Sequence, residues 1–282
     1  MKKVALIHDL SGFGKCSLTA AIPVISVMGI QACPLPTAIL SAQTGFRDYV
    51  CWDFTEQMNQ ITKHWEQLEV TFDGIYSGYL AGSTQVDKVL YFMEQFRKED
   101  TLYLVDPVMG DHGEYYSMFD RNFAEKMKEL TVKADVITPN LTELCMLAKV
   151  DYKDVISYRK EQDYIDRIGD ICKKLLTGAE RDQTIVVTGI LREKEGKEYV
   201  GNLSVSAREH FYLENPYTGL GFSGTGDLFA SVICASLVKG ETISQALSKA
   251  AYFLQDAIEE ATKEKIPTPH GVNFEKYLYR LL

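Results

Sequence analysis

The chain has 282 residues, of which 46% are hydrophobic and 24% are charged, as in a globular protein with one sizeable core. Its 39 acidic residues outnumber its 30 basic residues, which gives a formal net charge of −9. Because nucleic acids and many membrane surfaces are anionic, this balance argues against both as partners bound by charge attraction. We expect neither nucleic acid nor a membrane among the partners.

The first 46 residues do not form a targeting or membrane-spanning pattern. The apolar run Val4–Ile7 is followed at once by His8 and Asp9, so it is too short for a secretory signal. Residues 16–46 carry no charge, but three prolines interrupt them before they reach the roughly 20 apolar residues of a membrane span. We interpret them as a buried helix followed by a buried strand, and we expect a cytoplasmic protein.

The cysteines and histidines form no compact pattern. Six cysteines and five histidines are scattered along the chain, without C-x-x-C or H-E-x-x-H. Disulfide scaffolds and zinc ribbons need close spacing, so we expect buried, reduced thiols and no structural metal.

Short apolar runs alternate with longer segments of helical periodicity. The predicted strands are Lys3–His8, Gln31–Leu35, Gly74–Ser77, Leu102–Val105, Asp135–Thr138 and Thr184–Thr188, followed by an antiparallel hairpin of Glu198–Ser204 and Arg208–Leu213. Apolar residues at helical spacing, such as Val86, Val89 and Met93, predict core-facing helices between them. This alternation predicts an α/β fold with a mostly parallel central sheet covered on both faces. No linker or repeat is visible, so we expect a single domain over residues 1–282.

Polar or glycine-rich residues stand at the carboxyl ends of five of the predicted strands. They begin at Asp9, Ser77, Asp106, Thr138 and Thr188. Ligands of parallel sheets bind beyond the carboxyl ends of the strands. These residues therefore mark the edge at which we expect an active site.

Two glycine motifs resemble nucleotide-binding loops but lack essential parts. Gly14-Lys15-Cys16 has Cys where a P-loop needs Ser or Thr, and Asp9 stands where its first Gly belongs. Gly219–Gly224 matches G-x-G-x-x-G, but Glu214–Tyr217 precedes it where a strand should end. We therefore expect neither a phosphate-binding role for Lys15 nor a dinucleotide cofactor.

The strongest functional signal is Gly224-Thr225-Gly226-Asp227, which leads directly into an apolar helix-forming run. Successive backbone N–H groups at a helix N-terminus can bind a phosphate group and stabilise its charge during transfer. Asp227 follows in the first helical turn, beside this anion site. The alternative is that Asp227 only caps the helix.

A carboxylate beside an anion site suits the transfer of a phosphoryl group to an alcohol. That reaction also needs a metal ion, and Asp106 and Glu143 offer the oxygen ligands that Mg²⁺ prefers. Considered singly, each is an ordinary turn or surface residue. Together with Asp227 at one sheet edge, they predict a magnesium–phosphate site.

Four motifs, in order and with suitable spacing, resemble those of the pyridoxal kinase family of the ribokinase superfamily. Asp106–Asp111 is similar to the DPVxGD segment of that family, and Ser77–Leu80 to its SGYL turn. Thr138–Glu143 is similar to TPNxxE, and Gly224–Asp227 to GTGD. The resemblance covers nearly the whole chain. It implies a ribokinase-like three-layer α/β/α fold and ATP-dependent phosphorylation of the 5′-hydroxymethyl group of a vitamin B6 vitamer: pyridoxal, pyridoxamine or pyridoxine.

Carried over by position, the resemblance implies a role for each matched residue. Asp227 would be the base, and Gly224, Thr225 and Gly226 would bind the transferred phosphate. ATP would be surrounded by Asp106, Asn140, Glu143, Thr188 and Thr225, with Mg²⁺ bound by Asp106 and Glu143, directly or through water. The vitamer would contact Asp9, Ser11, Thr44, Tyr79 and Asp227, and a monovalent cation such as K⁺ would bind at Asp111 and Thr138. His112–Ser117 would form a lid, and a homodimer is implied.

Departures from the family pattern keep other functions open. Asp9-Leu10-Ser11-Gly12 is closer to a segment of hydroxymethylpyrimidine kinases, sister enzymes in thiamine synthesis, and Gln43 replaces a histidine of pyridoxal kinases. The sister enzymes typically carry GTGC where this chain keeps Asp227, which favours the B6 vitamer. The alternatives are a hydroxymethylpyrimidine kinase and a non-catalytic regulator that binds a vitamer or a nucleotide.

Overall fold

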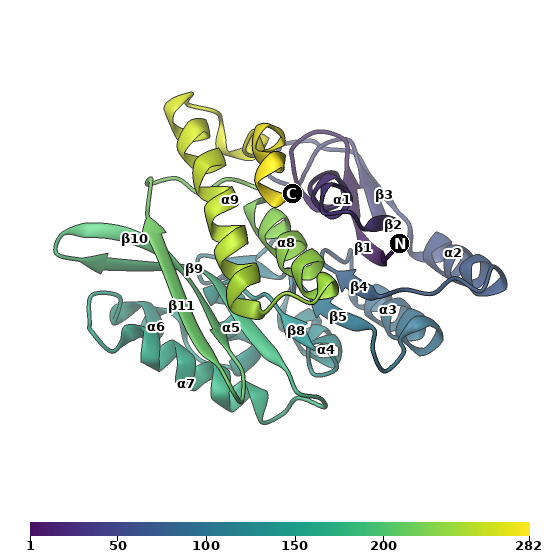
Figure 1. Ribbon diagram of the computed structural model, residues 1–282, viewed down its shortest axis with the longest axis horizontal. Coiled ribbons are helices and arrows are strands. Elements are labelled where there is room, and N and C mark those ends of the chain that lie inside the picture. Colours follow the sequence, from purple (N-terminus) through teal and green to yellow (C-terminus); the bar gives the residue numbers. More distant parts are fainter. The chain divides into compact units, whose positions relative to one another are not determined.

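The computed structural model describes all 282 residues. Its helices and mostly parallel strands alternate as in a three-layer α/β fold, which confirms the predicted fold class (Figure 1). The chain divides into two compact units: unit 1 comprises Met1–Leu104 and Leu220–Leu282, and unit 2 comprises Val105–Gly219. The single-domain expectation stays a prediction, because a compact unit need not fold alone.

Unit 1 holds the strands that begin the chain. In sheet order these strands are β5 (Leu102–Val105, whose last residue begins unit 2), β4 (Gly74–Ser77), β1 (Lys3–Ser11), β2 (Gln31–Leu40) and β3 (Cys51–Asp53). Its helices are α1 (Ser17–Val27), α2 (Thr55–Gln67), α3 (Ser83–Phe96), α8 (Thr225–Lys239) and α9 (Ile243–Lys263), with the 3-10 helices η1 (Thr268–His270) and η2 (Phe274–Leu281). β1 pairs in parallel with β2 and β4. Val4–Ile7 of β1 is completely buried, which explains its continuous apolar run.

Unit 2 contains the end of the sheet and a separate small hairpin. In sheet order its strands are β8 (Val136–Ile137), β9 (Thr184–Lys194), β10 (Lys197–Val205) and β11 (His210–Pro216), and the hairpin joins β6 (Gly110–Asp111) to β7 (Glu114–Tyr115). Its helices are α4 (Arg121–Thr131), α5 (Leu141–Ala148), α6 (Tyr152–Ser157) and α7 (Tyr164–Leu176). β8 and β9 are parallel, whereas β9, β10 and β11 are antiparallel, which confirms the predicted late hairpin.

The helices bury the apolar faces that their periodicity predicts. In α9, Ala246, Leu247 and Ala250 are completely buried, and a capping box between Thr242 and Gln245 begins the helix. α8 and α9 lie side by side in unit 1 (Figure 1). None of the helices combines the length and the apolarity needed to span a bilayer.

Three details of local structure differ from expectation. β11 runs to Pro216, so a strand ends before Gly219, contrary to expectation. Pro216 has no N–H to donate, which is tolerated because β11 is an edge strand. β11 is antiparallel to β10, so this is still no dinucleotide-binding strand–helix turn. The loop expected at His112–Ser117 contains β7. All six cysteines are free, but Cys51 is exposed and Cys33 is half-buried.

Candidate active site

The N-terminus of α8 has the geometry of an anion site. Gly224 precedes the helix with φ +80°, and a Cβ at this position would overlap the carbonyl oxygen of Lys15, so only glycine fits. Gly226 is exposed, with no heavy atom within 4 Å of where its Cβ would lie. The first N–H groups of a helix have no intrahelical acceptor. Those of α8 can therefore donate to a bound anion in the open space beside Gly226.

Asp227 lies in the first turn of α8 and is not its cap. Gly224 occupies the cap position, so the alternative of a capping role for Asp227 is wrong. Asp227 is half-buried, and the backbone N–H of Ser17 lowers the pKa of its carboxyl group. Burial, and to a lesser extent the charge of Asp9, raises the pKa of Asp227 to about 7. A carboxyl group with this pKa can accept a proton near neutral pH.

Asp9 lies opposite a bulge in β2, where β2 has one residue more than β1. The register between β1 and β2 shifts between His8 and Leu10, so Asp9 lies opposite both Thr37 and Ala38. Such bulges re-aim a side chain. Asp9 is only 4% exposed, and its carboxylate accepts a hydrogen bond from the Ser11 hydroxyl at 2.7 Å. Two of the predicted vitamer residues, Asp9 and Ser11, are therefore in direct contact.

Tyr79 joins this cluster, whereas Thr44 does not. Tyr79 follows β4 and is half-buried; burial, followed by the negative charge of Asp9, raises the pKa of its hydroxyl. Thr44 is exposed in the loop after β2, and no contact links it to Asp9 or Asp227. Its neighbour Gln43 is buried and donates to the carbonyl oxygen of Pro269 at 2.9 Å. Gln43 therefore holds this loop in place.

Lys15 is committed to other partners. Its ammonium group donates to the side chains of Asn273 and Glu275, both at 2.8 Å. These contacts tie the loop after β1 to the C-terminal η2. The position agrees with the expectation that Lys15 is not a phosphate-binding lysine.

In unit 2, Asp106, Asn140 and Glu143 come together. Asn140 caps α5, and its side chain and that of Glu143 form a reciprocal capping box. Asn140 also donates to the carbonyl oxygen of Gly110 at 2.9 Å. Glu143 accepts one backbone N–H on each carboxylate oxygen, from Met109 at 3.0 Å and from Asn140 at 2.9 Å. Unlike ordinary surface residues, Asp106 and Glu143 are 7% and 3% exposed.

The donor set of unit 2 fits a hard divalent cation. Burial and the neighbouring charge of Asp106 raise the pKa of Glu143 well above its ordinary value. Two buried carboxylates that repel each other are stabilised by a bound cation. No three His, Cys, Asp or Glu side chains form a cluster able to hold a metal by themselves. Mg²⁺ at Asp106 would therefore need further oxygen ligands from the phosphates of a nucleotide or from water.

The remaining predicted residues of unit 2 lie near the same loops. Thr188 lies within β9 and forms a parallel bridge with Asn140. Thr138 is buried, and its hydroxyl has no hydrogen-bond partner, as expected of an oxygen that can bind a cation. Asp111 is exposed and pairs with His112 at 3.5 Å. The predicted lid is a hairpin whose turn residue Gly113 donates to the Thr142 hydroxyl at 2.9 Å.

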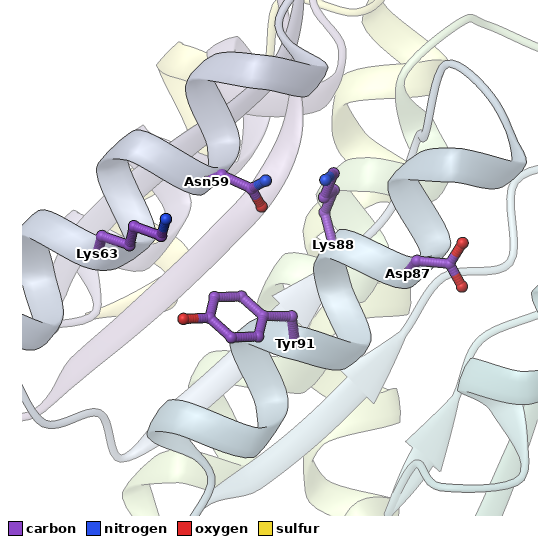
Figure 2. A pocket seen from close by; sticks show the side chains of 5 residues that line it. All are labelled: Asn59, Lys63, Asp87, Lys88 and Tyr91. Carbon is purple, nitrogen blue, oxygen red and sulfur yellow. The ribbon is translucent and has the colours of Figure 1, made fainter.

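A cavity on unit 1 lies apart from these residues. It has a volume of about 420 Å³ and is lined by Asn59 and Lys63 of α2 and by Asp87, Lys88 and Tyr91 of α3. Figure 2 shows the Asp87 carboxylate directed away from the other four side chains. None of the predicted site residues lines this cavity, so it is not the predicted active site.

Sequence reasoning overlooked Ser17, which influences both carboxyl groups of unit 1. Ser17 is buried at the start of α1, with φ +50°. Its backbone N–H lowers the pKa of Asp227, and its hydroxyl lowers the pKa of Asp9. A serine next to Gly14-Lys15-Cys16 suggests only a helix start. Its left-handed backbone leaves no mark in the sequence.

Comparison with known proteins identifies the family. Residues 14–271 match the phosphomethylpyrimidine kinase family. Because this match covers most of the chain, the chain belongs to that family, which is part of the ribokinase superfamily. The predicted membership of the superfamily is therefore confirmed.

Individual relatives are similar over almost the whole chain. A Bacteroides thetaiotaomicron protein, provisionally named a phosphomethylpyrimidine kinase and crystallised with pyridoxal, is 37% identical; the match has a TM-score of 0.90 and covers 99% of this chain and 95% of that one. Pyridoxal kinase from Lactobacillus plantarum is 26% identical, with a TM-score of 0.87 and coverage of 100% and 97%. Pyridoxal kinase PdxY from Haemophilus influenzae is 26% identical over 250 residues, which are 86% of this chain and 83% of that protein. The resemblance to pyridoxal kinases is thus confirmed.

Proposed function

We propose that the chain transfers the γ-phosphate of ATP to the 5′-hydroxymethyl group of a vitamin B6 vitamer, as in salvage of pyridoxal 5′-phosphate. The main support for this function is the position of Asp227, a half-buried carboxylate with a pKa of about 7 at the N-terminus of α8. This arrangement places a proton acceptor beside N–H groups able to bind phosphate. Kinase activity toward a B6 vitamer is also the activity named for the pyridoxal kinases to which the chain is similar.

The reaction forms one P–O bond and breaks another. Asp227 accepts the proton of the hydroxymethyl group while the oxygen of that group bonds to the γ-phosphorus. The bond between the γ-phosphorus and the bridging oxygen breaks, and ADP leaves. The N–H groups of Gly224, Thr225 and Gly226 stabilise the negative charge on the transferred phosphoryl group. The first turn of α8 thus supplies both the base and the anion site.

The residues of unit 2 suit the nucleotide. Asp106, Asn140, Glu143 and Thr188 would surround ATP, with Mg²⁺ held by Asp106 and, through water, by Glu143. When bound, Mg²⁺ would neutralise charge on the phosphate oxygens. The unpartnered hydroxyl of Thr138, together with Asp111, would bind a monovalent cation such as K⁺. The exposed His112–Ser117 segment would act as the lid that excludes water.

The ring of the acceptor is assigned to the cluster of Asp9, Ser11 and Tyr79, with Thr44 at the exposed loop. The similar Bacteroides protein was crystallised with pyridoxal, which supports a pyridine ring. Asp9 favours a second candidate, because the Asp9–Gly12 segment resembles hydroxymethylpyrimidine kinases. A competition assay with pyridoxal, pyridoxamine and hydroxymethylpyrimidine, in the presence of MgATP, decides between the two rings. Preferential phosphorylation of the pyrimidine would overturn the assignment of a B6 vitamer.

The role of the base is tested with Asp227→Asn. We expect turnover of pyridoxal to fall at least about 100-fold, the usual contribution of a general base, while ATP binding measured by calorimetry stays within about twofold of wild type. Near-normal turnover under conditions where chemistry limits the rate would refute the assigned base. Tight vitamer binding without phosphorylation of any tested alcohol by the wild type would instead indicate a non-catalytic regulator.

We also propose that the chain is a cytoplasmic homodimer, as its resemblance to pyridoxal kinases implies. Light scattering coupled to gel filtration measures its mass against the 31.8 kDa of one chain. A mass equal to that of one chain would refute the homodimer, and tagged protein recovered outside the cytoplasm would refute the location.

A further inference from the structure

The side chain of His8 fills the space in which a side chain of residue 78 would lie. A Cβ added to Gly78 would be 2.3 Å from Nδ1 of the His8 imidazole and 2.4 Å from its Cε1, far inside van der Waals contact. The backbone of Gly78 is not left-handed, so its conformation does not itself require glycine. The close approach of the imidazole is therefore what requires glycine at this position.

The imidazole of His8 acts through its shape. It meets the ring of Tyr76 edge to face, with 4.2 Å between the centroids and 81° between the planes, and both side chains are completely buried. Neither nitrogen of His8 has a hydrogen-bond partner, and burial lowers its pKa to about 3, so the ring is neutral. A buried polar group without hydrogen bonds costs stability. Such a local cost is expected where function requires the residue.

The contact between His8 and Gly78 lies where the pairing of β1 with β4 ends. Ile7 is the last residue of β1 that pairs with β4, and its carbonyl oxygen accepts the N–H of Gly78 at 3.0 Å. His8 and Gly78 are the next residues of the two segments, and Asp9 and Tyr79 follow them directly. The contact therefore sets the separation of the two backbones immediately before the residues assigned to the acceptor ring.

The backbone of Tyr79 is also held from β2 and α3. The hydroxyl of Thr37, on β2, donates to the carbonyl oxygen of Tyr79 at 2.9 Å. The side chain of Gln85, on α3, donates to the carbonyl oxygen of Thr37 at 2.8 Å and accepts the N–H of Ala81 at 2.8 Å. Thr37 and Gln85 are both buried. Hydrogen bonds thus hold Tyr79 and the residues after it, while His8 fixes the residue before it.

We propose that the His8 imidazole and the bare backbone of Gly78 form a matched pair, and that His8 is thereby a positioning residue for the acceptor ring. The pair sets the distance between Asp9 and Tyr79. This inference rests on the proposed assignment of those two residues to the ring of the acceptor. Because a misplacement of about 1 Å can cost on the order of 100-fold in rate, a contact behind the site is enough to change the reaction.

A double-mutant cycle tests the pair, because the methyl group of Gly78→Ala fits only where the imidazole is absent. Gly78→Ala should lower kcat/KM for pyridoxal about tenfold, while the KM for ATP stays within about twofold of wild type. His8→Ala leaves a cavity beside Gly78 and should lower the same kcat/KM about threefold. In the double variant the methyl group takes the space of the ring. Its kcat/KM for pyridoxal should be at least about threefold above that of Gly78→Ala, a coupling usual for residues in contact.

Gly74→Ala is the matched control, because it crowds a buried glycine at the other end of β4. Its Cβ would be 2.8 Å from a methyl carbon of Val238. It should lower the midpoint of urea unfolding without changing kcat/KM for pyridoxal, and His8→Ala should not reverse its effect. An equal loss of kcat/KM in Gly74→Ala would overturn the positioning role, as would a double variant no more active than Gly78→Ala. If either single variant does not fold, recovery of folded protein in the double variant decides the pairing in the same way.

NMR of the Tyr79 ring separates this inference from the proposed function. With no vitamer present, the ring resonances, assigned with Tyr79→Phe, should move in His8→Ala and in Gly78→Ala. They should return toward their wild-type positions in the double variant. Resonances that stay in place in His8→Ala, or that do not return in the double variant, would overturn the proposal. A wild-type protein that phosphorylates no acceptor would refute the proposed function, yet the resonances would still decide whether His8 positions Tyr79.

Discussion

The raised pKa of Asp227 has a consequence for stability as well as for catalysis. In the unfolded chain, Asp227 has an ordinary pKa near 3.8, whereas in the folded protein it is about 7. Between these values the folded state binds a proton that the unfolded state has already lost. The stability contributed by the protonated group is complete below pH 3.8 and is lost as pH rises through 7. Asp227→Asn removes this loss, because an amide does not ionise.

The size of the effect follows from the shift. A difference of about three pKa units corresponds to about 4 kcal/mol as an upper bound. Within the range where the protein can be handled, pH 5 to pH 8, we expect the stability of Asp227→Asn relative to the wild type to rise by about 3 kcal/mol. Almost all of this rise should occur below pH 7, with a plateau above it. The variant that abolishes turnover should therefore be the more stable protein at pH 8.

Urea unfolding followed by circular dichroism, at four pH values from 5 to 8, measures this difference for the wild type and the variant. Asp100→Asn is the control, because Asp100 is an exposed residue in the loop after α3. It should leave the free energy of unfolding close to that of the wild type. A constant difference between the wild type and Asp227→Asn across the range would refute the argument, since it would mean that Asp227 ionises alike in both states.

Three further changes test other parts of the site. Gly224→Ala should cost about 3 kcal/mol or more, from left-handed strain and overlap with the carbonyl of Lys15, whereas Gly226→Ala should stay within about 1 kcal/mol of wild type in urea unfolding. Equal costs would refute this account of Gly224. Lys15→Met removes an exposed ion pair, so the free energy of unfolding should fall by about 1 kcal/mol while the KM for ATP stays within about twofold of wild type. A tenfold rise in that KM would indicate that Lys15 does bind phosphate. The amide of Glu143→Gln cannot accept both backbone N–H groups, so the free energy of unfolding should fall by about 1–3 kcal/mol. The Mg²⁺ concentration needed for turnover should rise. An unchanged Mg²⁺ titration would show that Glu143 is not part of the metal site.

The interior of the fold could be predicted from the sequence because buried parallel strands are continuous apolar runs. β4 and β5 have the predicted bounds. β2 extends five residues past the predicted end at Leu35, to Leu40. Pro34 and Pro36 obscured it, but β3 pairs with β2 only from Ala38 to Leu40, so the prolines lie where one edge of the strand is open. The two-residue strands β6 and β7 are too short for any periodicity to reveal them.

The site was predictable at the level of residue types but not of their connections. Gly224–Asp227 could be recognised because glycines before an apolar helix have few other uses. The bulge in β2 opposite Asp9 could not be recognised, because it depends on pairing between β1 and β2 across the sheet. The left-handed backbone of Ser17 is likewise a result of tertiary structure. Local sequence therefore identified the two carboxylates of unit 1 but not the influence of Ser17 on them.

The surroundings of half-buried Asp227 and of buried Glu143 explain why two acids in one protein suit different tasks. Both have a raised pKa, and burial is the main cause for each. Glu143 has one backbone N–H on each oxygen, so its orientation is fixed and its remaining lone pairs suit a static ligand. Only one backbone N–H, that of Ser17, lowers the pKa of Asp227, so a carboxylate oxygen is left to take a proton. Burial disfavours the ionised form of both groups. The number of backbone N–H partners distinguishes Glu143, a positioned ligand, from Asp227, a base.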